Sequence, residues 1–263
     1  MYLHVKENML WTRYTFGPVL SRRLGNSLGL NVLPQRKKIC NFNCIYCECG
    51  LNDKYATKYP LPSVSEYTDE LEATLSQLKT DGRALDHLTF AGNGEPTLHP
   101  QFLEIVESTC TLRSKYYPEA EIAVLTDAVH ADSENIFRAL QLVEKPIMKI
   151  DAGSEEMFQK IDRPETRIEL RDILKGLQRF ESNFIVQTLF LRGTVDGQII
   201  DNTCEEELDL LLQHYRTLQP RFVMVYSFDR PAPIPGLEKI PSSELEAITN
   251  RINAAGIPAR CYP

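Results

Sequence analysis

The sequence has no long apolar run and no excess of basic residues, and each absence narrows the range of functions. No hydrophobic stretch approaches the ~18 apolar residues that a membrane helix needs, and the strand-sized segment 222–226 is among the longest. We therefore expect no membrane partner. The 29 Lys and Arg residues are outnumbered by 36 Asp and Glu residues, so the formal net charge is −7 and a domain-wide basic surface for nucleic acid is excluded.

A bias toward disorder and a secretory signal are also missing. Gly and Pro stay close to background, and 43% of the 263 residues are hydrophobic, which is enough to bury a core. The first residues contain neither an apolar core nor a small-residue cleavage site, so we expect no secretory signal and a cytoplasmic protein. Basic residues at 22–23 and 36–38 are typical of solvated loops. They could contact phosphates, but the overall charge does not favour tRNA as a partner.

Segments typical of strands and helices alternate along almost the whole chain. Apolar runs predict six strands, at residues 27–33, 87–91, 121–125, 147–150, 184–191 and 222–226. Helices are expected between and after them, with capping signals at Ser63/Glu66, Asp132, Thr203/Glu206 and Ser243/Glu246, and with helical spacing over 102–112, 154–161 and 168–180. This alternation predicts an α/β protein with a parallel sheet, either open and doubly wound or a barrel lacking its last two units. No linker divides the chain, so we expect one domain over 1–263, with an N-terminal extension over 1–26.

Three cysteines crowd into a C-x₃-C-x₂-C motif, Cys40, Cys44 and Cys47. The total of seven is odd, and without a signal peptide this favours reduced thiols and a metal site over disulfides. Soft thiolates select iron–sulfur, zinc or copper(I), and Cys49 could be a fourth ligand. Zinc sites usually present two separated C-x₂-C pairs, which the chain lacks, so an iron–sulfur cluster is favoured and zinc stays the alternative. The other cysteines form no second triplet, so no auxiliary cluster is expected.

Polar clusters follow several of the predicted strands. They comprise the cysteine motif, the segment Gly92, Asn93, Gly94, Glu95 and Pro96, then Thr126 with Asp127, residues 151–153 and residues 227–230. In parallel α/β folds the carboxyl ends of the strands bind ligands, so we expect these clusters to share one rim. Taken singly, a Gly-rich turn or a polar strand end is often only a tight turn or a helix cap.

The cysteine motif with Tyr46 before its last Cys, followed by GNGEP after the next strand, resembles the radical S-adenosylmethionine superfamily. GPVLSRRLGNSLGLNVLP, KIDAG, VQTLFLRG and YSFDRPAPIPGLEKI resemble the stand-alone Fe–S oxidoreductases related to wyosine-synthase-type radical enzymes. The resemblance implies a partial (β/α)₆ barrel with a cluster-binding loop over 34–62. Its cofactors would be a 4Fe–4S cluster and S-adenosylmethionine.

The resemblance also implies roles for individual residues. Cys40, Cys44 and Cys47 would bind three irons, and the fourth iron would bind the amine and carboxylate of S-adenosylmethionine. The remaining cofactor-binding residues would be Tyr46 near the adenine, Gly92, Asn93, Gly94, Glu95 and Pro96 along the methionine with Glu95 near its ammonium, Thr126, Lys149 and Asp151. Candidate catalytic residues are Asp151 and Gln187, and a buried structural role is the alternative for Gln187. Asp127 stands where many relatives have Asn, so its contact with the cofactor is open.

The resemblance implies an enzyme that reductively cleaves S-adenosylmethionine to a 5′-deoxyadenosyl radical, which abstracts hydrogen from a substrate. An RNA nucleoside, a small molecule and a peptide are the candidate substrate classes. A flavodoxin or ferredoxin would donate the electron. The alternatives are a non-catalytic iron–sulfur protein for electron transfer or sensing, and a zinc-stabilised binding module.

Overall fold

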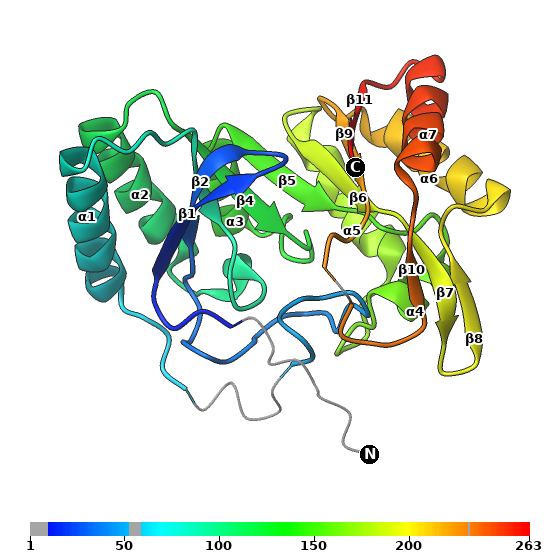
Figure 1. Cartoon of the computed structure of the whole chain (residues 1–263), viewed down its shortest axis with the longest axis horizontal. Coiled ribbons are helices and arrows are strands. Elements are labelled where there is room, and N and C mark those ends of the chain that lie inside the picture. Colours follow the sequence, from blue (N-terminus) through cyan, green and yellow to red (C-terminus); the bar gives the residue numbers. More distant parts are fainter. Residues whose placement is uncertain (1–9, 53–58, 231) are drawn as a thin grey trace.

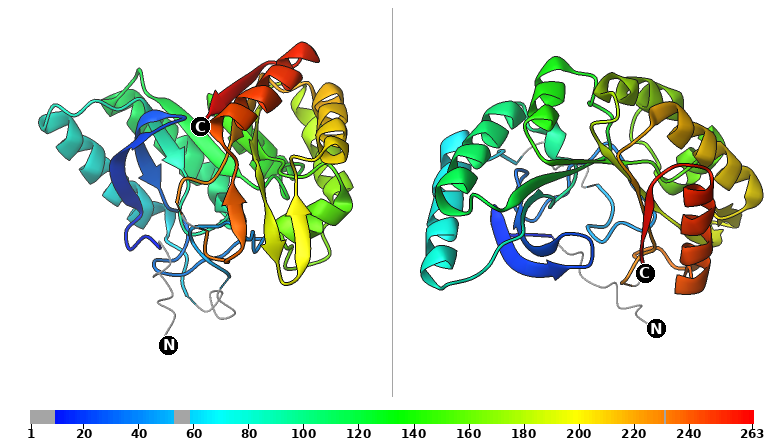
Figure 2. Two further views of the ribbon diagram at one scale, coloured as in Figure 1. Left: turned by 45° about the vertical axis from the view of Figure 1, so that its right-hand side comes forward. Right: turned by 90° about the horizontal axis from the view of Figure 1, so that it is seen from above.

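The computed structural model describes residues 10–52, 59–230 and 232–263, and its main feature is one strongly curved sheet (Figure 1). Seen from above, the sheet forms an arc with helices along its outer side, which is a half barrel (Figure 2). Within these ranges the strands follow the order β1-β2-β3-β4-β5-β6-β9-β11. They are β1 (Thr15–Ser21), β2 (Gly25–Leu30), β3 (His87–Phe90), β4 (Glu121–Thr126), β5 (Lys145–Lys149), β6 (Ile185–Leu189), β9 (Val223–Tyr226) and β11 (Ala259–Tyr262).

Within this sheet every neighbouring pair from β2 through β3, β4, β5, β6 and β9 to β11 is parallel. Only β1 joins the sheet antiparallel, beside β2. The prediction of a partial barrel is confirmed, and the open doubly wound alternative is wrong. The six predicted strands correspond to β2, β3, β4, β5, β6 and β9. The two edge strands were not predicted, because β1 contains a Gly17-Pro18 pair that argues against a strand interior, and β11 has the sequence ARCY, which is not an apolar run.

Helices cover the outer face of the arc and bury the apolar stripes that the spacing predicts. In α2, the residues Phe102, Ile105, Val106, Thr109 and Leu112 are all buried. The helices are α1 (Val64–Thr80), α2 (Phe102–Tyr116), α3 (Glu134–Gln141), α4 (Glu155–Ile161), α5 (Leu170–Leu177), α6 (Glu205–Leu218) and α7 (Ser242–Ala254), with 3-10 turns η2 (Pro96–Leu98) and η3 (Gln178–Phe180). In the described ranges, none of these helices is long and apolar enough to cross a membrane.

The helix caps were predicted only in part. Ser63 forms the expected capping box on α1, and Ser154 caps α4. The cap at Asp132 is wrong, because Ser133 holds that position on α3. The other two predicted boxes are wrong as well, because helices α6 and α7 begin after Cys204 and Pro241. The carboxylate of Asp201 accepts hydrogen bonds from both the amide and the hydroxyl of Thr203, which ties that hydroxyl to the preceding strand.

A second, three-stranded antiparallel sheet lies beside the half barrel (Figure 1). Its strands are β10 (Leu237–Lys239), β7 (Leu191–Val195) and β8 (Gln198–Asp201). The single strand predicted over 184–191 is therefore wrong at its end, because the chain leaves the large sheet after Leu189 and enters β7. Asn202 fixes this bend, since its side chain donates to the carbonyls of Asp151 and Leu189 and accepts from the amide of Leu191.

Two apolar layers form because strand side chains alternate between the faces of a sheet. Outward-facing residues pack under the helices in the main core. Inside the barrel a small apolar cluster closes the amino-terminal half, and it consists of Leu24, Ala123, Ile147, Ile185 and Met224. The interior nearer the carboxyl ends is lined instead by polar groups, among them Lys149, Gln187, Asp127 and Asp151. The fold thus confines the polar chemistry to one end of the barrel.

Candidate functional site

The cysteine loop crosses the carboxyl ends of the strands and is fastened on both sides by backbone hydrogen bonds. On one side the amide of Ile39 donates to the carbonyl of Asn93 (2.9 Å), and the amide of Glu95 donates to the carbonyl of Ile39 (2.9 Å). On the other side the amides of Asn43 and Ile45 donate to carbonyls at the end of α4, those of Arg163 and Ile161. The loop therefore joins β3 to α4 across the rim.

Gly94 lies where the cysteine loop contacts the segment after β3, and this position requires a glycine. Its φ is +129°, and a Cβ added there would lie 1.8 Å from the carbonyl oxygen of Ile39. Any side chain would push the cysteine loop away from the strand end. The Gly-rich segment is therefore more than a tight turn, because it is the surface against which the cysteine loop is seated.

The thiols of Cys40, Cys44, Cys47 and Cys49 lie close enough to influence one another electrostatically. Burial raises the pKa of the Cys40 and Cys44 thiols. The hydrogen bond from Cys49, aided by the Lys38 ammonium, lowers the pKa of Cys47 to about 5. The Cys49 Sγ also lies 3.2 Å from the carbonyl oxygen of Gly92. A buried group of thiols beside a cation is the donor set that an iron–sulfur cluster requires, so the residues fit this group.

The thiols are not arranged around a single ion. In the described part of the chain, no three His, Cys, Asp or Glu side chains converge as they would on one bound metal ion.

Lys38 is a cation inside this loop that the sequence did not indicate. It is only 2% exposed, and its Nζ donates to the carbonyl of Gly50 (2.8 Å). Burial acts to lower the pKa of Lys38, but the neighbouring cysteines together raise it above its ordinary value. Reading residue 38 as part of a solvated, phosphate-contacting run is therefore wrong. The buried ammonium instead offsets the negative charge of the thiolates.

Glu95 lies at the centre of a hydrogen-bond network that joins the ends of β3 and β4. Its Oε1 accepts from the amide and hydroxyl of Thr97 and from the hydroxyl of Thr126 (2.8 Å). Its Oε2 accepts one bond, from the amide of Asp127 (2.7 Å), and an oxygen with two lone pairs can accept another. Burial and the nearby Asp127 raise the pKa of Glu95 to about 8. The structure thus brings Glu95 and Thr126 together at one rim, as the sequence predicted.

Asn93 and Asp127 have structural partners. Asn93 is fully buried, and its side chain holds the backbone of Trp11 and Pro34. Asp127 accepts from the side-chain amide of Asn41 (2.9 Å) and lies 3.9 Å from the Cys40 Sγ. Asp127 therefore contacts the cysteine loop directly.

Lys149, Asp151 and Tyr46 meet in one buried cluster together with Asp162. Lys149 Nζ lies 3.1 Å from Asp151 Oδ2 and pairs with Asp162, and the Tyr46 hydroxyl donates to Asp151. Burial acts to lower the pKa of Lys149, but the two carboxylates raise it above its ordinary value. Burial raises the pKa of Tyr46, so its phenol stays neutral. Sequence reasoning missed Asp162, which lies at the end of α4 outside every motif.

Gln187 lies on β6, beside Lys149 in register, and its side chain faces the barrel interior. Its Oε1 accepts a hydrogen bond of 2.6 Å from Arg23, whose guanidinium stacks over the ring of Tyr226. The two candidate catalytic residues, Gln187 and Asp151, therefore sit in separate hydrogen-bond groups.

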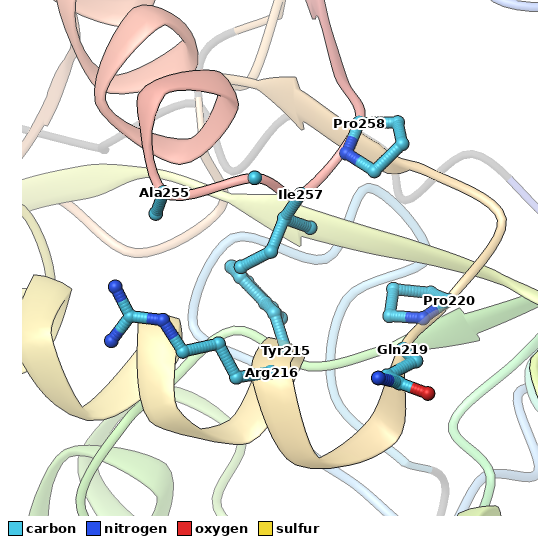
Figure 3. Close-up of a pocket in the computed structure, with 8 residues that line it drawn as sticks. Tyr215, Arg216, Gln219, Pro220, Ala255, Ile257 and Pro258 are labelled. Carbon is cyan, nitrogen blue, oxygen red and sulfur yellow. The ribbon is translucent and has the colours of Figure 1, made fainter.

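A surface cavity of about 380 Å³ lies away from this rim (Figure 3). Its walls are the end of α6 with Gln219 and Pro220, and the segment that precedes β11, including Ala255, Ile257 and Pro258. These segments lead into β9 and β11, so the cavity lies at the amino ends of the strands, opposite the cysteine loop.

The fold and the loop define a class of protein, a partial α/β barrel that carries a thiol-rich loop at the rim where such folds bind ligands. The family model of the Radical SAM superfamily matches residues 37–204. Because this match covers well over half of the chain, the protein belongs to the Radical SAM superfamily. The cofactors of this superfamily are a 4Fe–4S cluster and S-adenosylmethionine.

Curated relatives match most of the chain. A protein named GTPase Obg from Brachyspira hyodysenteriae is 28% identical over 230 residues, which are 85% of this chain and 31% of that protein. The chain thus spans about a third of that relative's length. A UPF0026 protein of Synechocystis sp. is 29% identical over 266 residues and is matched almost end to end, with 94% of this chain and 96% of the relative covered. The latter fits the predicted stand-alone group.

Solved structures support the fold. A radical SAM methyltransferase from Sphaerobacter thermophilus superposes with a TM-score of 0.61 at 14% identity, covering 89% of this chain and 65% of that one. An archaeal TYW1 superposes with a TM-score of 0.54 at 11% identity, covering 87% and 72%. At these identities the comparison establishes the half-barrel architecture, in agreement with the resemblance drawn from the motifs.

Proposed function

We propose that this protein is a radical S-adenosylmethionine enzyme that cleaves its cofactor reductively and uses the resulting radical to abstract hydrogen from a substrate. The observation that carries the proposal is the seating of the cysteine loop on the Gly92–Glu95 segment at the carboxyl rim, through the paired backbone bonds of Ile39. This contact brings a thiol group and a ligand-lining strand end together at the place where parallel α/β folds bind ligands.

In this proposal Cys40, Cys44 and Cys47 would hold the 4Fe–4S cluster, and one of its irons would be left to bind S-adenosylmethionine. When bound, the cluster delivers one electron to the sulfonium, which breaks a C–S bond to give methionine and a 5′-deoxyadenosyl radical. The chain supplies binding, orientation and exclusion of water. Lys38 balances the charge of the thiolates.

The rim residues take complementary parts in holding S-adenosylmethionine. The backbone over 92–96 lines the methionine, and Glu95 offers Oε2 to its ammonium while Thr126 keeps the carboxylate aligned. Tyr46 borders the adenine, with its hydroxyl fixed by Asp151. The Nζ of Lys149 lies within 6 Å of the Tyr46 ring centroid and helps to hold this ring in place. The radical would then face the barrel interior, where the substrate binds.

The substrate classes remain an RNA nucleoside, a small molecule and a peptide, with a flavodoxin or ferredoxin as electron donor. The burial of Lys38 removes one cation from the basic run that could have contacted tRNA phosphates. This weakens the case for a nucleic-acid partner and favours the other two classes.

The test is anaerobic reconstitution with iron and sulfide, followed by dithionite and S-adenosylmethionine. We expect 5′-deoxyadenosine and methionine in equal amounts, measured by chromatography. Cys44→Ala should lose both cluster and product, whereas Cys110→Ala, which alters a cysteine on the outer helix α2, should keep both. A wild-type protein that holds the cluster and makes no 5′-deoxyadenosine would refute the proposal.

Calorimetry with S-adenosylmethionine separates the proposal from an electron-transfer or sensing role. A radical enzyme should bind about one S-adenosylmethionine per cluster, because three cysteine ligands would leave one iron to bind it. An electron carrier should show no saturable heat. Cluster-loaded protein without such binding would favour the electron carrier.

A further inference from the structure

The turn between β1 and β2 carries an arginine across the interior of the half barrel. Arg23 lies in this turn, and its guanidinium reaches the far side, where it donates to Gln187 on β6 (2.6 Å) and stacks 4.4 Å from the ring centroid of Tyr226 on β9. The turn is rigid, because Ser21 Oγ accepts from the amides of both Arg23 and Leu24, and the Leu24 side chain is buried in the interior cluster. The Arg23 side chain is thus fixed at its backbone by the turn and at its guanidinium by Gln187 and Tyr226.

Charge balance distinguishes Arg23 from its surroundings. Lys149 is paired with Asp151 and Asp162. Arg23 forms no ion pair with any Asp or Glu side chain in the described ranges, and its two partners are a neutral amide and a phenol ring. Burial raises the pKa of Tyr226 to about 12, so this phenol supplies no negative charge at neutral pH.

The adjacent Arg22 is the natural comparison. Arg22 is exposed, lies 3.8 Å from Asp229 and donates to the carbonyl of Pro263, so its charge is partnered and solvated. Arg23 is half-buried, and within the described ranges its side-chain partners are Gln187 and Tyr226, which leaves donors of its guanidinium without a carboxylate acceptor there. A half-buried guanidinium without a counter-charge can form charge-assisted hydrogen bonds with an anionic ligand.

The position of Arg23 fits a substrate group better than the cofactor. Gln187 pairs in register with Lys149, one layer below Asp151, whereas Tyr226 pairs with Leu189 at the level of Asp151. The guanidinium of Arg23 therefore lies between these two layers of the interior. The cysteine loop lies above the strand ends. A molecule bound under the cysteine loop would therefore present its lower end to Arg23.

We propose that Arg23, positioned by Gln187 and Tyr226, binds an oxyanion of the substrate, a carboxylate or a phosphate. This assignment rests on the proposed function, because it places the substrate inside the barrel beneath the cofactor. It narrows the substrate to molecules with a negatively charged group. Gln187 is then a positioning residue for Arg23, and its contact with the substrate is indirect.

The experiment is equilibrium dialysis of the reconstituted, S-adenosylmethionine-loaded protein against radiolabelled inorganic phosphate or acetate, at constant ionic strength kept with chloride. We expect saturable uptake of one anion per chain. Arg23→Gln should weaken anion binding by about tenfold or more, because it removes the positive charge. Arg23→Lys should retain part of the affinity, because the ammonium keeps the charge but not the several donors of the guanidinium. Arg22→Gln, on the same turn, should bind as wild type does.

Several outcomes overturn the assignment. Wild-type protein that takes up neither anion, or Arg23→Gln protein that binds as tightly as wild type, would do so. A fall in S-adenosylmethionine affinity equal to the fall in anion affinity would place Arg23 on the cofactor carboxylate instead. If Arg23→Gln does not fold, the charged Arg23→Lys variant carries the test, with an intermediate affinity expected. Preference between phosphate and acetate assigns the chemistry, and anion uptake is measured independently of whether 5′-deoxyadenosine forms.

Discussion

The rim holds two pairs of buried carboxylates that are neutralised in different ways. On the β5–α4 side, Asp151 and Asp162 are both paired with Lys149, and we call these three residues the lysine cluster. On the β3–β4 side, Glu95 and Asp127 form no ion pair with any side chain in the described ranges, and we call them the open pair. The lysine cluster carries its own counter-charge, whereas the open pair lacks one. In the proposed function, the ammonium of S-adenosylmethionine would supply the counter-charge of the open pair.

The largest effect is expected from a substitution that breaks the lysine cluster. Lys149→Met leaves two buried carboxylates without a partner and should destabilise the protein by about 3–5 kcal/mol. Denaturant unfolding measures this loss. The control is Lys145→Met on the same strand, whose half-exposed pair with Glu121 should be worth less than about 1 kcal/mol. Equal losses in the two variants would show that Lys149 is not the counter-charge of a buried cluster.

The open pair is tested through cofactor affinity. Glu95→Gln removes the charge proposed to meet the S-adenosylmethionine ammonium, so the dissociation constant should rise roughly tenfold to a hundredfold. Calorimetry on reconstituted protein measures it. Asp162→Asn, the corresponding change in the lysine cluster, should alter affinity far less after its loss of stability is accounted for. The same rise in both variants would remove the distinction between the two pairs.

The raised pKa of Glu95, about 8, makes the binding of S-adenosylmethionine depend on pH. Near pH 7 the buried carboxyl is mostly protonated, and a bound ammonium favours its charged form, so binding should release up to about one proton. The release should shrink as the pH rises past 8. Calorimetry in buffers of different ionisation enthalpy measures it, and Glu95→Gln should abolish it. If Glu95→Gln released as many protons as the wild type, the titrating group would be a residue other than Glu95.

The smallest effects come from single hydrogen bonds on each side. Thr97→Val removes a hydroxyl that donates to Glu95 Oε1, and Ser154→Ala removes the N-cap of α4, next to the lysine cluster. Each should cost about 1 kcal/mol of stability. Only Thr97→Val should also weaken S-adenosylmethionine binding, by a few-fold. An effect of Ser154→Ala on affinity would mean that the cap of α4 also contributes to binding the cofactor.

The sequence predicted the shared rim because parallel strands place their carboxyl ends at one edge. This reasoning located Glu95, Thr126 and Asp151 correctly at the end of three strands. It could not show which of these carboxylates belongs to a buried ion-pair cluster, because that cluster needs Asp162 at the end of α4, 13 residues from Lys149. Partners that are distant in sequence decide that question.

Other residues escaped the sequence for local reasons. Lys38 stands in a basic run typical of exposed loops, and only the packing of the cysteine loop reveals its burial. Asp162 lies at a helix end, where a polar residue is ordinary. Arg23 belongs to the segment predicted as an N-terminal extension, because the Gly17-Pro18 pair hides the strand that precedes it. In each case the tertiary contact carries the information that the local pattern lacks.

The two-sided fastening of the cysteine loop has a consequence for the order of assembly during synthesis. The loop bonds to Asn93 on one side and to Arg163 on the other, and Arg163 leaves the ribosome long after the cysteines. Until that residue has emerged and α4 has folded, the thiols are part of an unclosed segment. We therefore expect iron–sulfur insertion to follow release of most of the chain, with the nascent cysteines depending on the reducing capacity of their surroundings in the interval.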